Sequence, residues 1–139
     1  MTANFLDSNI FVYLFDNTDE LKQAEAKKIV ESNLRNGTGT ISFQVVQEVL
    51  NVVSHKMAVP LTPNDAIGFL DAVLVPCWRV FPSAELYRRA IEIKTRYQYG
   101  FYDSLIVAAA LSAGCKRLLS EDLHGGQMIA NLEIVNPFA

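Results

Sequence analysis

The chain has 139 residues, a formal net charge of −3 and a hydrophobic fraction of 50%, which is the size and composition of a folded domain rather than a disordered chain. No apolar run reaches the roughly 20 residues of a membrane-spanning helix, and the opening MTANFLDS lacks the basic start of a signal peptide, so we expect a soluble cytoplasmic protein with a single domain over residues 1–139. The acidic balance disfavours nucleic-acid binding, unless the acids gather at a metal site where bound cations offset them.

The first half of the chain alternates short apolar runs with amphipathic stretches. In chain order, we expect a strand at 4–7, helices at 8–16 and 19–37, a strand at 39–42 and a helix at 43–57. Ser8 or Asn9 is a suitable N-terminal cap for the first of these helices, and Gly37 is a suitable C-terminal cap for the second. This alternation is typical of an α/β domain with a parallel sheet.

The second half continues the same pattern. We expect a helix at 62–74, a strand at 78–81, helices at 83–98 and 101–114, a strand at 116–120 and a short last strand at 133–138. Thr62 is a suitable cap for the first of these helices, with Pro63 at its first position. The helix that ends at Gly114 is apolar nearly all round and is expected to be buried. The predicted fold class is α/β, with a central, mostly parallel sheet of four to five short strands flanked by helices.

Two acidic residues follow predicted strands. Asp7 stands at the carboxyl end of the first strand, and Asp122 stands just past the carboxyl end of the 116–120 strand. Ligands of open α/β sheets bind at the carboxyl ends of the strands, so both acids face one crevice if these strands are parallel neighbours. Each acid alone also fits a helix cap or a turn residue, and only their shared position favours a site.

Two further acids lie on predicted helices. Asp103 is in the first turn of the helix expected to be buried, where the helix dipole stabilises a carboxylate. Burying an ionised carboxylate is nevertheless costly unless it is paired or binds a metal. Glu48 lies at the margin of an apolar helical stripe, beside Gln44 and His55, a position that also fits a solvated glutamate. Glu48 is a candidate site residue only in combination with the other three acids.

These four carboxylates have no metal-binding cysteine or paired histidine beside them. Cys77 and Cys115 lack metal-ligand spacing and are expected to be reduced structural residues. The set therefore favours Mg²⁺ or Mn²⁺ over zinc. Such acid clusters suit phosphoryl chemistry, in which metal ions stabilise charge on the attacking and leaving oxygens and lower the pKa of the attacking water. His55 and His124 could assist proton transfer, although lone histidines are more often incidental.

Four motifs in this order, FLDSNIFVYLF, QEVLNV, YDSLIVAAAL and LLSEDL, resemble the PIN-domain ribonucleases, most closely the VapC-like toxins of bacterial toxin–antitoxin pairs. Each motif is weak alone, but the resemblance spans nearly the whole chain. The acids of the family pattern fall on Asp7, Glu48, Asp103 and Asp122. The hydroxyl and amide residues of the pattern fall on Ser8, Asn9 and Ser120, which would orient carboxylates or bound water. Glu121 is a possible extra acid, although its neighbour Asp122 fits the pattern better.

The resemblance implies hydrolysis of RNA by a metal-activated water with Mg²⁺ or Mn²⁺, leaving a 5′-phosphate and a 3′-hydroxyl. It assigns metal binding to Asp7, Asp103 and Asp122, and it assigns help with the metal or orientation of the water to Glu48. It also implies a homodimer and a cognate antitoxin whose C-terminal segment lies across the active-site groove.

A group of basic residues precedes Asp103 on the 83–98 helix, and aromatic residues follow it. The basic residues are Arg88, Arg89, Lys94 and Arg96. A basic patch beside aromatics could hold phosphates and stack unpaired bases, although a solvated helix face next to core aromatics fits the same residues.

Other functions for an acidic pocket fit less well. A haloacid-dehalogenase-like phosphatase needs a second acid two residues after its first-strand Asp, where this chain has Asn9. A phosphorelay receiver domain needs a lysine after its last strand, and EIVNPFA has none. The alternative from another class is a PIN-fold module that binds RNA or protein with negligible catalysis. Metal-dependent cleavage would separate it from the ribonuclease.

Overall fold

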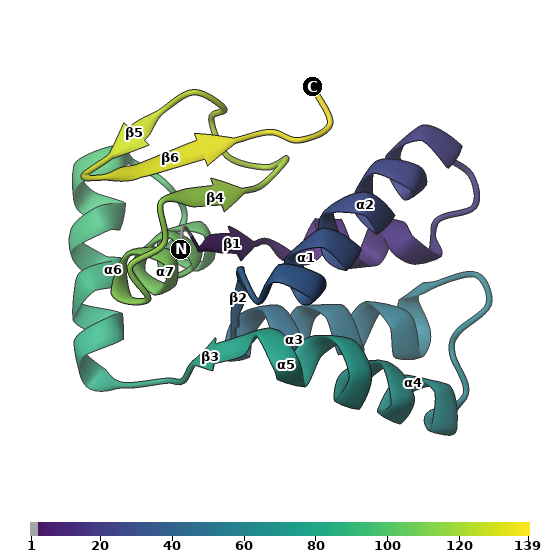
Figure 1. Cartoon of the computed structure of the whole chain (residues 1–139). Helices are drawn as coiled ribbons and strands as arrows, with labels where there is room; N and C mark the ends of the chain where they lie inside the picture. Colours follow the sequence, from purple (N-terminus) through teal and green to yellow (C-terminus); the bar gives the residue numbers. More distant parts are fainter. Residues whose placement is uncertain (1–2) are drawn as a thin grey trace.

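The sheet lies between two groups of helices in the computed structural model, which describes residues 3–139 (Figure 1). Its strands are β1 (Asn4–Leu6), β2 (Gly39–Ser42), β3 (Trp78–Val80), β4 (Arg117–Leu119), β5 (Met128–Ile129) and β6 (Leu132–Val135). Their spatial order is β3-β2-β1-β4-β6-β5, and each neighbouring pair is parallel except β5 and β6. The mostly parallel α/β fold is thus confirmed, but the sheet has six strands rather than four to five.

The additional strand is β5, which forms an antiparallel hairpin with β6. Ala130 and Asn131 connect the two strands, and Ala130 has a positive φ of 52°. Hairpin turns that need a positive φ are normally marked by Asn-Gly or Asp-Gly, so this alanine-containing turn gives no such sequence signal. The last strand also begins and ends earlier than expected, because β6 covers Leu132–Val135 rather than 133–138.

Helices fill most connections between the strands. They are α1 (Ser8–Val12), α2 (Glu20–Asn36), α3 (Phe43–Asn51), α4 (Pro63–Phe69), α5 (Val75–Cys77), α6 (Ala84–Tyr97) and α7 (Phe101–Ser112), with the shorter turns η1 (Tyr13–Phe15), η2 (Val52–Lys56) and η3 (Leu70–Leu74). The predicted caps are confirmed at Gly37, which has a φ of 65°, and at Thr62, whose side chain accepts a hydrogen bond from the Asp65 N–H. The turns η2 and η3 are π-helical, a distortion that is frequent at functional sites.

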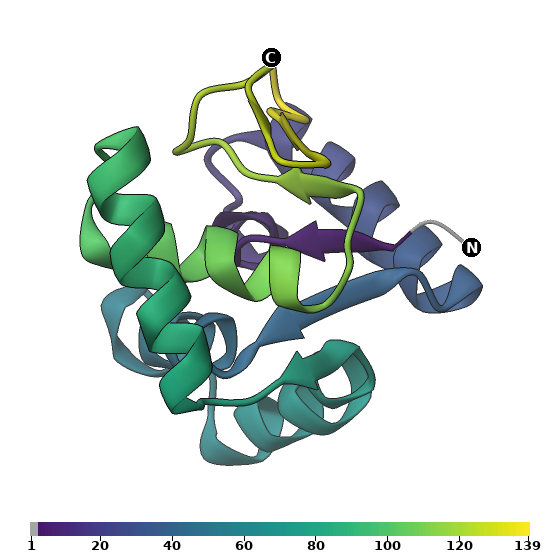
Figure 2. The same cartoon turned by 90° about the vertical axis from the view of Figure 1, so that its left-hand side faces the viewer.

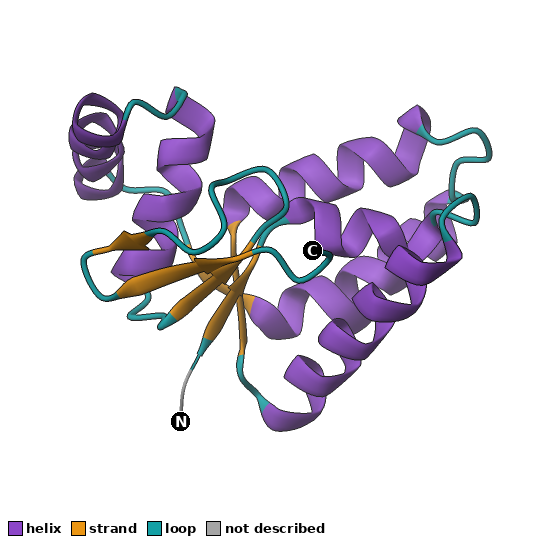
Figure 3. Cartoon of the chain, turned by 90° about the horizontal axis from the view of Figure 1, so that it is seen from above, coloured by secondary structure: helices purple, strands orange, loops and turns teal. Residues whose placement is uncertain are grey.

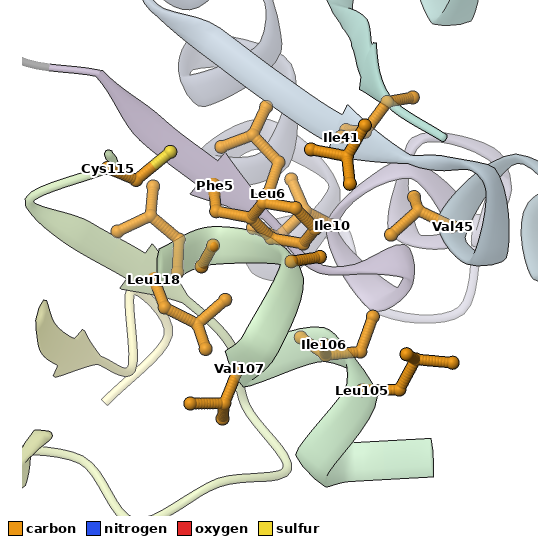
Figure 4. Close-up of a cluster of buried hydrophobic side chains, with 14 of the residues drawn as sticks. Phe5, Leu6, Ile10, Ile41, Val45, Leu105, Ile106, Val107, Cys115 and Leu118 are labelled. Atoms are coloured by element: carbon orange, nitrogen blue, oxygen red, sulfur yellow. The ribbon is translucent and has the colours of Figure 1, made fainter. Parts of the chain in front are cut away.

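Helices α6 and α7 cover one face of the sheet, and α2 lies on the opposite face (Figures 1 and 2). Helix α7 is buried from Ser104 to Ala110, which confirms the expectation from its apolar composition. Figure 4 shows Val107 of α7 in one cluster with Phe5 of β1 and Leu118 of β4, and all three are fully buried. Removal of this apolar surface from water is the main force that holds α7 against the sheet.

The two cysteines, which are expected to be reduced structural residues, lie in the core. Cys77 and Cys115 are both buried free thiols, and burial raises the pKa of each. Buried thiols of this kind are unreactive, in agreement with a structural role. Within residues 3–139, no helix combines the length and the apolar composition that crossing a membrane requires.

The carboxyl ends of β1 and β4 emerge at the same edge of the sheet. These strands are parallel neighbours, with Leu6 opposite Leu119, so the expected arrangement is confirmed. Seen from above, the strands run side by side away from the N-terminus and toward the helices (Figure 3). The next residues along the two strands are Asp7 and Ser120, and they begin the site described below.

Candidate functional site

Asp7 follows directly after β1, where its backbone N–H donates to the Leu119 carbonyl of β4 at 3.0 Å. The residue is only 6% exposed. Its Oδ1 accepts the Ser8 backbone N–H at 2.8 Å, and its Oδ2 accepts the Ser120 hydroxyl at 2.7 Å. The N-terminal cap of α1 is therefore Asp7 rather than Ser8 or Asn9. Asp7 also places a carboxylate at the carboxyl edge of the sheet, so its interpretations as a cap and as a site residue are compatible.

The environment of Asp7 opposes its negative charge. Burial raises the pKa of Asp7, and the hydrogen bonds from Ser120 and Ser8 lower it. The negative charges of Asp122 and Asp103 add to the rise, and the net direction is upward. The two hydrogen bonds thus do not fully replace the lost water. A cation bound beside Asp7 would reverse the direction, because an opposite charge favours the ionised carboxylate.

Two polar side chains bind Asp122, and one of them also binds Asp7. Ser120 is fully buried; its hydroxyl donates to Asp7 and accepts the backbone N–H of Asp122 at 3.2 Å. Asn9 extends from α1, and its Nδ2 donates to Asp122 Oδ2 at 2.6 Å. Both acids are therefore held by groups from the two neighbouring strand ends.

Glu48 and Asp103 extend the acidic cluster from α3 and α7. The Ser8 hydroxyl lies 3.4 Å from Asp7 Oδ1 and 3.2 Å from Glu48 Oε1, so its single proton serves one of them at a time. Partial burial raises the pKa of Glu48, and the charge of Asp7 raises it further. Asp103 is exposed as a residue, yet partial burial of its carboxylate and the charge of Asp122 raise its pKa. Asp7 therefore interacts electrostatically with each of the other three acids.

Gln44 links the two helices that carry Glu48 and Asp103, a contact that the sequence did not indicate. It is buried on α3, one helical turn before Glu48, and its Nε2 donates to the Tyr102 carbonyl at 3.2 Å. This bond joins α3 to the first turn of α7, directly beside Asp103. The only sequence signal for it is the four-residue spacing to Glu48, which places both side chains on one helix face.

A surface hollow of about 260 Å³ lies at this edge of the sheet. We call it the acid hollow, and the described residues that line it are Ser8, Asn9, Val12, Glu48, Asn51, Val52, Lys56 and Asp122. Lys56 is the one cation among these lining residues. It ends the π-helical turn η2, and no pattern in the sequence marks it as part of the site.

The acids fit a divalent cation in charge and in donor type. In the part of the chain from residue 3 onward, no three histidine, cysteine, aspartate or glutamate side chains are already placed as ligands of one ion. Carboxylate oxygens are nevertheless the ligands that Mg²⁺ and Mn²⁺ prefer. Burial is the largest cause of the raised pKa values of Asp7, Glu48 and Asp103, and the negative charge of neighbouring acids adds to it. A cation bound here would offset both effects, because an opposite charge favours the ionised carboxylates.

Glu121, named above as a possible extra acid, is bound in a different cluster. Lys22 Nζ lies 2.7 Å from its Oε2, and the Tyr13 hydroxyl donates to its Oε1 at 2.5 Å. Lys22 also lies 5.0 Å from the ring centre of Tyr13 and 5.9 Å from that of Phe138. Burial acts to raise the pKa of Glu121, but the bonds from Lys22 and Tyr13 lower it overall. We call these four residues the lysine cluster; its carboxylate already has a cation.

The basic residues predicted to bind RNA are all exposed on α6. They are Arg88, Arg89, Lys94 and Arg96. At about 100° per residue, Arg89 and Arg96 lie on one flank of the helix and Lys94 lies on the other, so the four side chains spread around α6. His55 and His124 are exposed, and the His124 ring centre is 6.1 Å from that of Tyr99.

The profile of the PIN domain family matches residues 5–124 of this chain. The matched range contains the acids Asp7, Glu48, Asp103 and Asp122. No curated protein sequence matches the chain significantly.

Several solved structures have the same fold. A toxin–antitoxin complex from Klebsiella pneumoniae matches with a TM-score of 0.69 and 18% identity, over 97% of this chain and 98% of that chain. VapBC2 from Rickettsia felis, bound to a DNA fragment from its promoter, matches with a TM-score of 0.65 and 22% identity, over 96% and 97% of the two chains. VapC20 from Mycobacterium tuberculosis, a sarcin–ricin loop cleaving toxin, matches with a TM-score of 0.62 and 19% identity, over 86% and 92%.

At these identities the likeness to solved structures is one of fold. The family profile is the stronger finding, because it covers residues 5–124 of the 139-residue chain, from β1 to the loop after β4. The chain belongs to the PIN domain family.

Proposed function

We propose that this PIN domain is an endoribonuclease that depends on Mg²⁺ or Mn²⁺ and acts as the toxin of a toxin–antitoxin pair. The observation that carries the proposal is the mutual effect of the four acids, each of which shares one electrostatic environment with the others at the carboxyl edge of β1 and β4. The similar structures add support, since those from K. pneumoniae and R. felis are toxin–antitoxin assemblies and VapC20 cleaves RNA of the sarcin–ricin loop.

In this proposal Asp7, Asp103 and Asp122 hold the cation. When bound, a divalent cation stabilises negative charge on the scissile phosphate and makes a water molecule more acidic. Ser120 keeps the Asp7 carboxylate in place through its 2.7 Å hydrogen bond, and Asn9 does the same for Asp122 at 2.6 Å. These bonds would orient the ligands before a cation arrives.

Glu48 is assigned to the attacking water. Its raised pKa makes the carboxylate a stronger base than an ordinary glutamate, while the Ser8 hydroxyl at 3.2 Å fixes one of its oxygens. Glu48 would accept a proton from the water as the water oxygen adds to phosphorus. The bond between phosphorus and the 3′ oxygen breaks, and the 3′ oxygen takes up a proton from solvent water, so the products carry a 5′-phosphate and a 3′-hydroxyl.

The same proposal includes two protein partners. One is a second copy of the chain in a homodimer, and the other is an antitoxin whose C-terminal segment covers the acid hollow. The toxin–antitoxin assemblies among the similar structures support an antitoxin. The alternative is a PIN-fold module that binds RNA or protein with negligible catalysis.

Cleavage of RNA by the purified chain tests the proposal. Total RNA and transfer RNA are incubated with Mg²⁺ or Mn²⁺, with EDTA, and with an Asp103→Asn variant. Asp71→Asn is the matched control, because Asp71 is an exposed acid of η3 outside the site. We expect discrete products with new 5′-phosphate ends that require both the metal and Asp103.

Two results would contradict the proposal. Products that persist in EDTA and in Asp103→Asn would assign the cleavage to another mechanism. RNA binding that is unchanged in Asp103→Asn, without cleavage of any RNA by the wild-type chain, would favour the binding module.

A further inference from the structure

A second hollow, of about 470 Å³, continues from the acid hollow. The two hollows share Val12, Val52 and Lys56. From these residues the second hollow extends past Phe15 and Met57, between the chain that follows η1 and the chain that follows η2. We call it the side hollow.

The walls of the side hollow suit a flat apolar group. Phe15 is partly buried, and the Phe69 ring supports it edge to face at a centroid distance of 5.0 Å. Val12 and Met57 complete this apolar surface. An aromatic ring that is held in place and still reachable is the kind of surface on which unpaired RNA bases stack.

One rim of the side hollow is polar and ordered. Asp16 Oδ1 accepts both the Thr18 N–H at 2.9 Å and the Thr18 hydroxyl at 2.5 Å. The hydrogen bonds from Thr18 lower the pKa of Asp16, so its carboxylate stays charged near neutral pH. A carboxylate in this position can accept hydrogen bonds from the amino groups of a base.

Lys56 lies at the junction of the two hollows. It is exposed and lines both of them, so its ammonium group is available beside Glu48 and Asp122 on one side and the apolar walls on the other. RNA that enters the acid hollow brings a chain of phosphates, and a lysine ammonium is a general phosphate ligand. A nucleotide carries its phosphate and its base on one sugar, so a cation beside an apolar surface offers a partner to each.

We infer that the side hollow is a nucleotide subsite: Lys56 binds a phosphate next to the cleaved bond, and an unstacked base of the same RNA lies against Phe15 and Met57. This inference rests on the proposed ribonuclease function and specifies how the substrate would be held.

The position of the side hollow favours RNA over a protein segment. The side hollow shares Val12, Val52 and Lys56 with the acid hollow, where the RNA would be cut. Its volume is about 470 Å³. Volumes of this order suit a single small-molecule-sized group.

RNA binding by a variant that does not cleave the RNA tests the inference. The Asp103→Asn background is used with a short single-stranded RNA that spans a mapped cleavage site, or with an unstructured mixed-sequence RNA if none is found. Fluorescence anisotropy then compares Lys56→Ala and Lys56→Arg, with Lys28→Ala as the control at an exposed lysine of α2. Lys56→Ala should bind roughly tenfold more weakly and reduce the salt slope by about 0.7, whereas Lys56→Arg should retain most of the affinity.

The proposed contact with the base is tested by a substitution at the rim of the side hollow. Val59 is 81% exposed, so Val59→Glu adds a charge to the side hollow without disturbing the core, and Ile67→Glu is its control at an exposed position of α4. Val59→Glu should weaken binding severalfold. An abasic site at one position beside the cleaved bond should remove that penalty, because two changes at one contact are not additive.

Opposite results would overturn the inference. If Lys56→Ala and Val59→Glu bind RNA as the controls do, the side hollow belongs to a protein partner. If the Val59→Glu penalty persists with every abasic RNA, no base lies there. A wild-type chain that binds RNA through Lys56 without cutting any RNA would contradict the proposed function alone. Undiminished cleavage by Lys56→Ala and Val59→Glu in the chain that keeps Asp103 would contradict the subsite alone.

Discussion

Glu121 and Asp122 are consecutive acids with opposite surroundings. Glu121 pairs with Lys22 at 2.7 Å, and this contact together with Tyr13 lowers its pKa. Asp122 instead faces the acid hollow, where its negative charge helps to raise the pKa of Asp7 and of Asp103. The lysine cluster satisfies its carboxylate, whereas the acid cluster leaves charge uncompensated. An acid that is paired with a cation of the chain thus stabilises the fold, whereas acids without such a partner are available to a ligand.

The largest effect is expected from removing one charge of the acid cluster. Asp7→Asn should lower cleavage by roughly a thousandfold, since metal ligation stabilises the transition state by several kcal/mol. The fold should stay intact or become more stable, because the change relieves repulsion among the acids and an asparagine can still accept the Ser8 N–H. Product formation and the Tm are compared with those of Asp71→Asn. Severe unfolding of Asp7→Asn would instead mean that Asp7 is mainly a helix cap.

A smaller effect is expected from the serine that joins two acids. Ser120→Ala should lower cation affinity or activity by roughly 10- to 100-fold, because residues that orient metal ligands typically matter to this extent. Ser104→Ala is the matched control. Both serines are fully buried, but the Ser104 hydroxyl has no hydrogen-bond partner within the described residues. Calorimetric titration with Mn²⁺ measures the affinity, and equal values for the two variants would refute the role of Ser120.

The stability of the metal-free chain should fall as pH rises through the acid range toward neutrality. Burial and neighbouring charge raise the pKa of Asp7, Glu48 and Asp103. At a pH between the ordinary and the raised pKa of these groups, the folded state therefore binds more protons than the unfolded state. The free energy of unfolding therefore decreases with pH in that window. Glu121 acts in the opposite sense: its lowered pKa contributes stability that is lost as pH falls through its folded value.

Thermal unfolding in EDTA across this range measures the effect. We expect Asp7→Asn to flatten the decrease and Mn²⁺ to raise the Tm most at neutral pH, where the acids are ionised. A Tm that rises steadily with pH in the metal-free wild type would show that the acid cluster is compensated in the absence of a cation.

The smallest effect is expected from the lysine cluster. Lys22→Ala removes the cation of Glu121, so it should lower the Tm slightly and reduce cleavage a few-fold by loosening the loop that carries Asp122. Lys22→Arg should restore both, because it keeps the charge. Lys28→Ala, at an exposed position of the same helix, controls for loss of one surface charge. A loss of cleavage as large as that of Asp7→Asn would abolish the distinction between the two clusters.

Local patterns were sufficient for most of the fold. Helix periodicity and capping residues located the helices, including the turn at Gly37 and the capped start at Thr62. The buried character of α7 followed from its composition. The hairpin of β5 and β6 was missed because a two-residue strand has no periodicity and its turn contains Ala130 rather than glycine.

The sequence by itself determined the fold class, the helices and the positions of Asp7 and Asp122 after two strands, because these depend on residues close together in the chain. Only the tertiary structure decided which groups meet across 99 residues in the Lys22–Glu121 pair or 113 residues in the Asn9–Asp122 pair. It likewise brought Gln44 to the start of α7 and Lys56 to the acid hollow. The physical reason is that a carboxylate is paired or unpaired according to its neighbours in space, and sheet register and helix packing choose those neighbours.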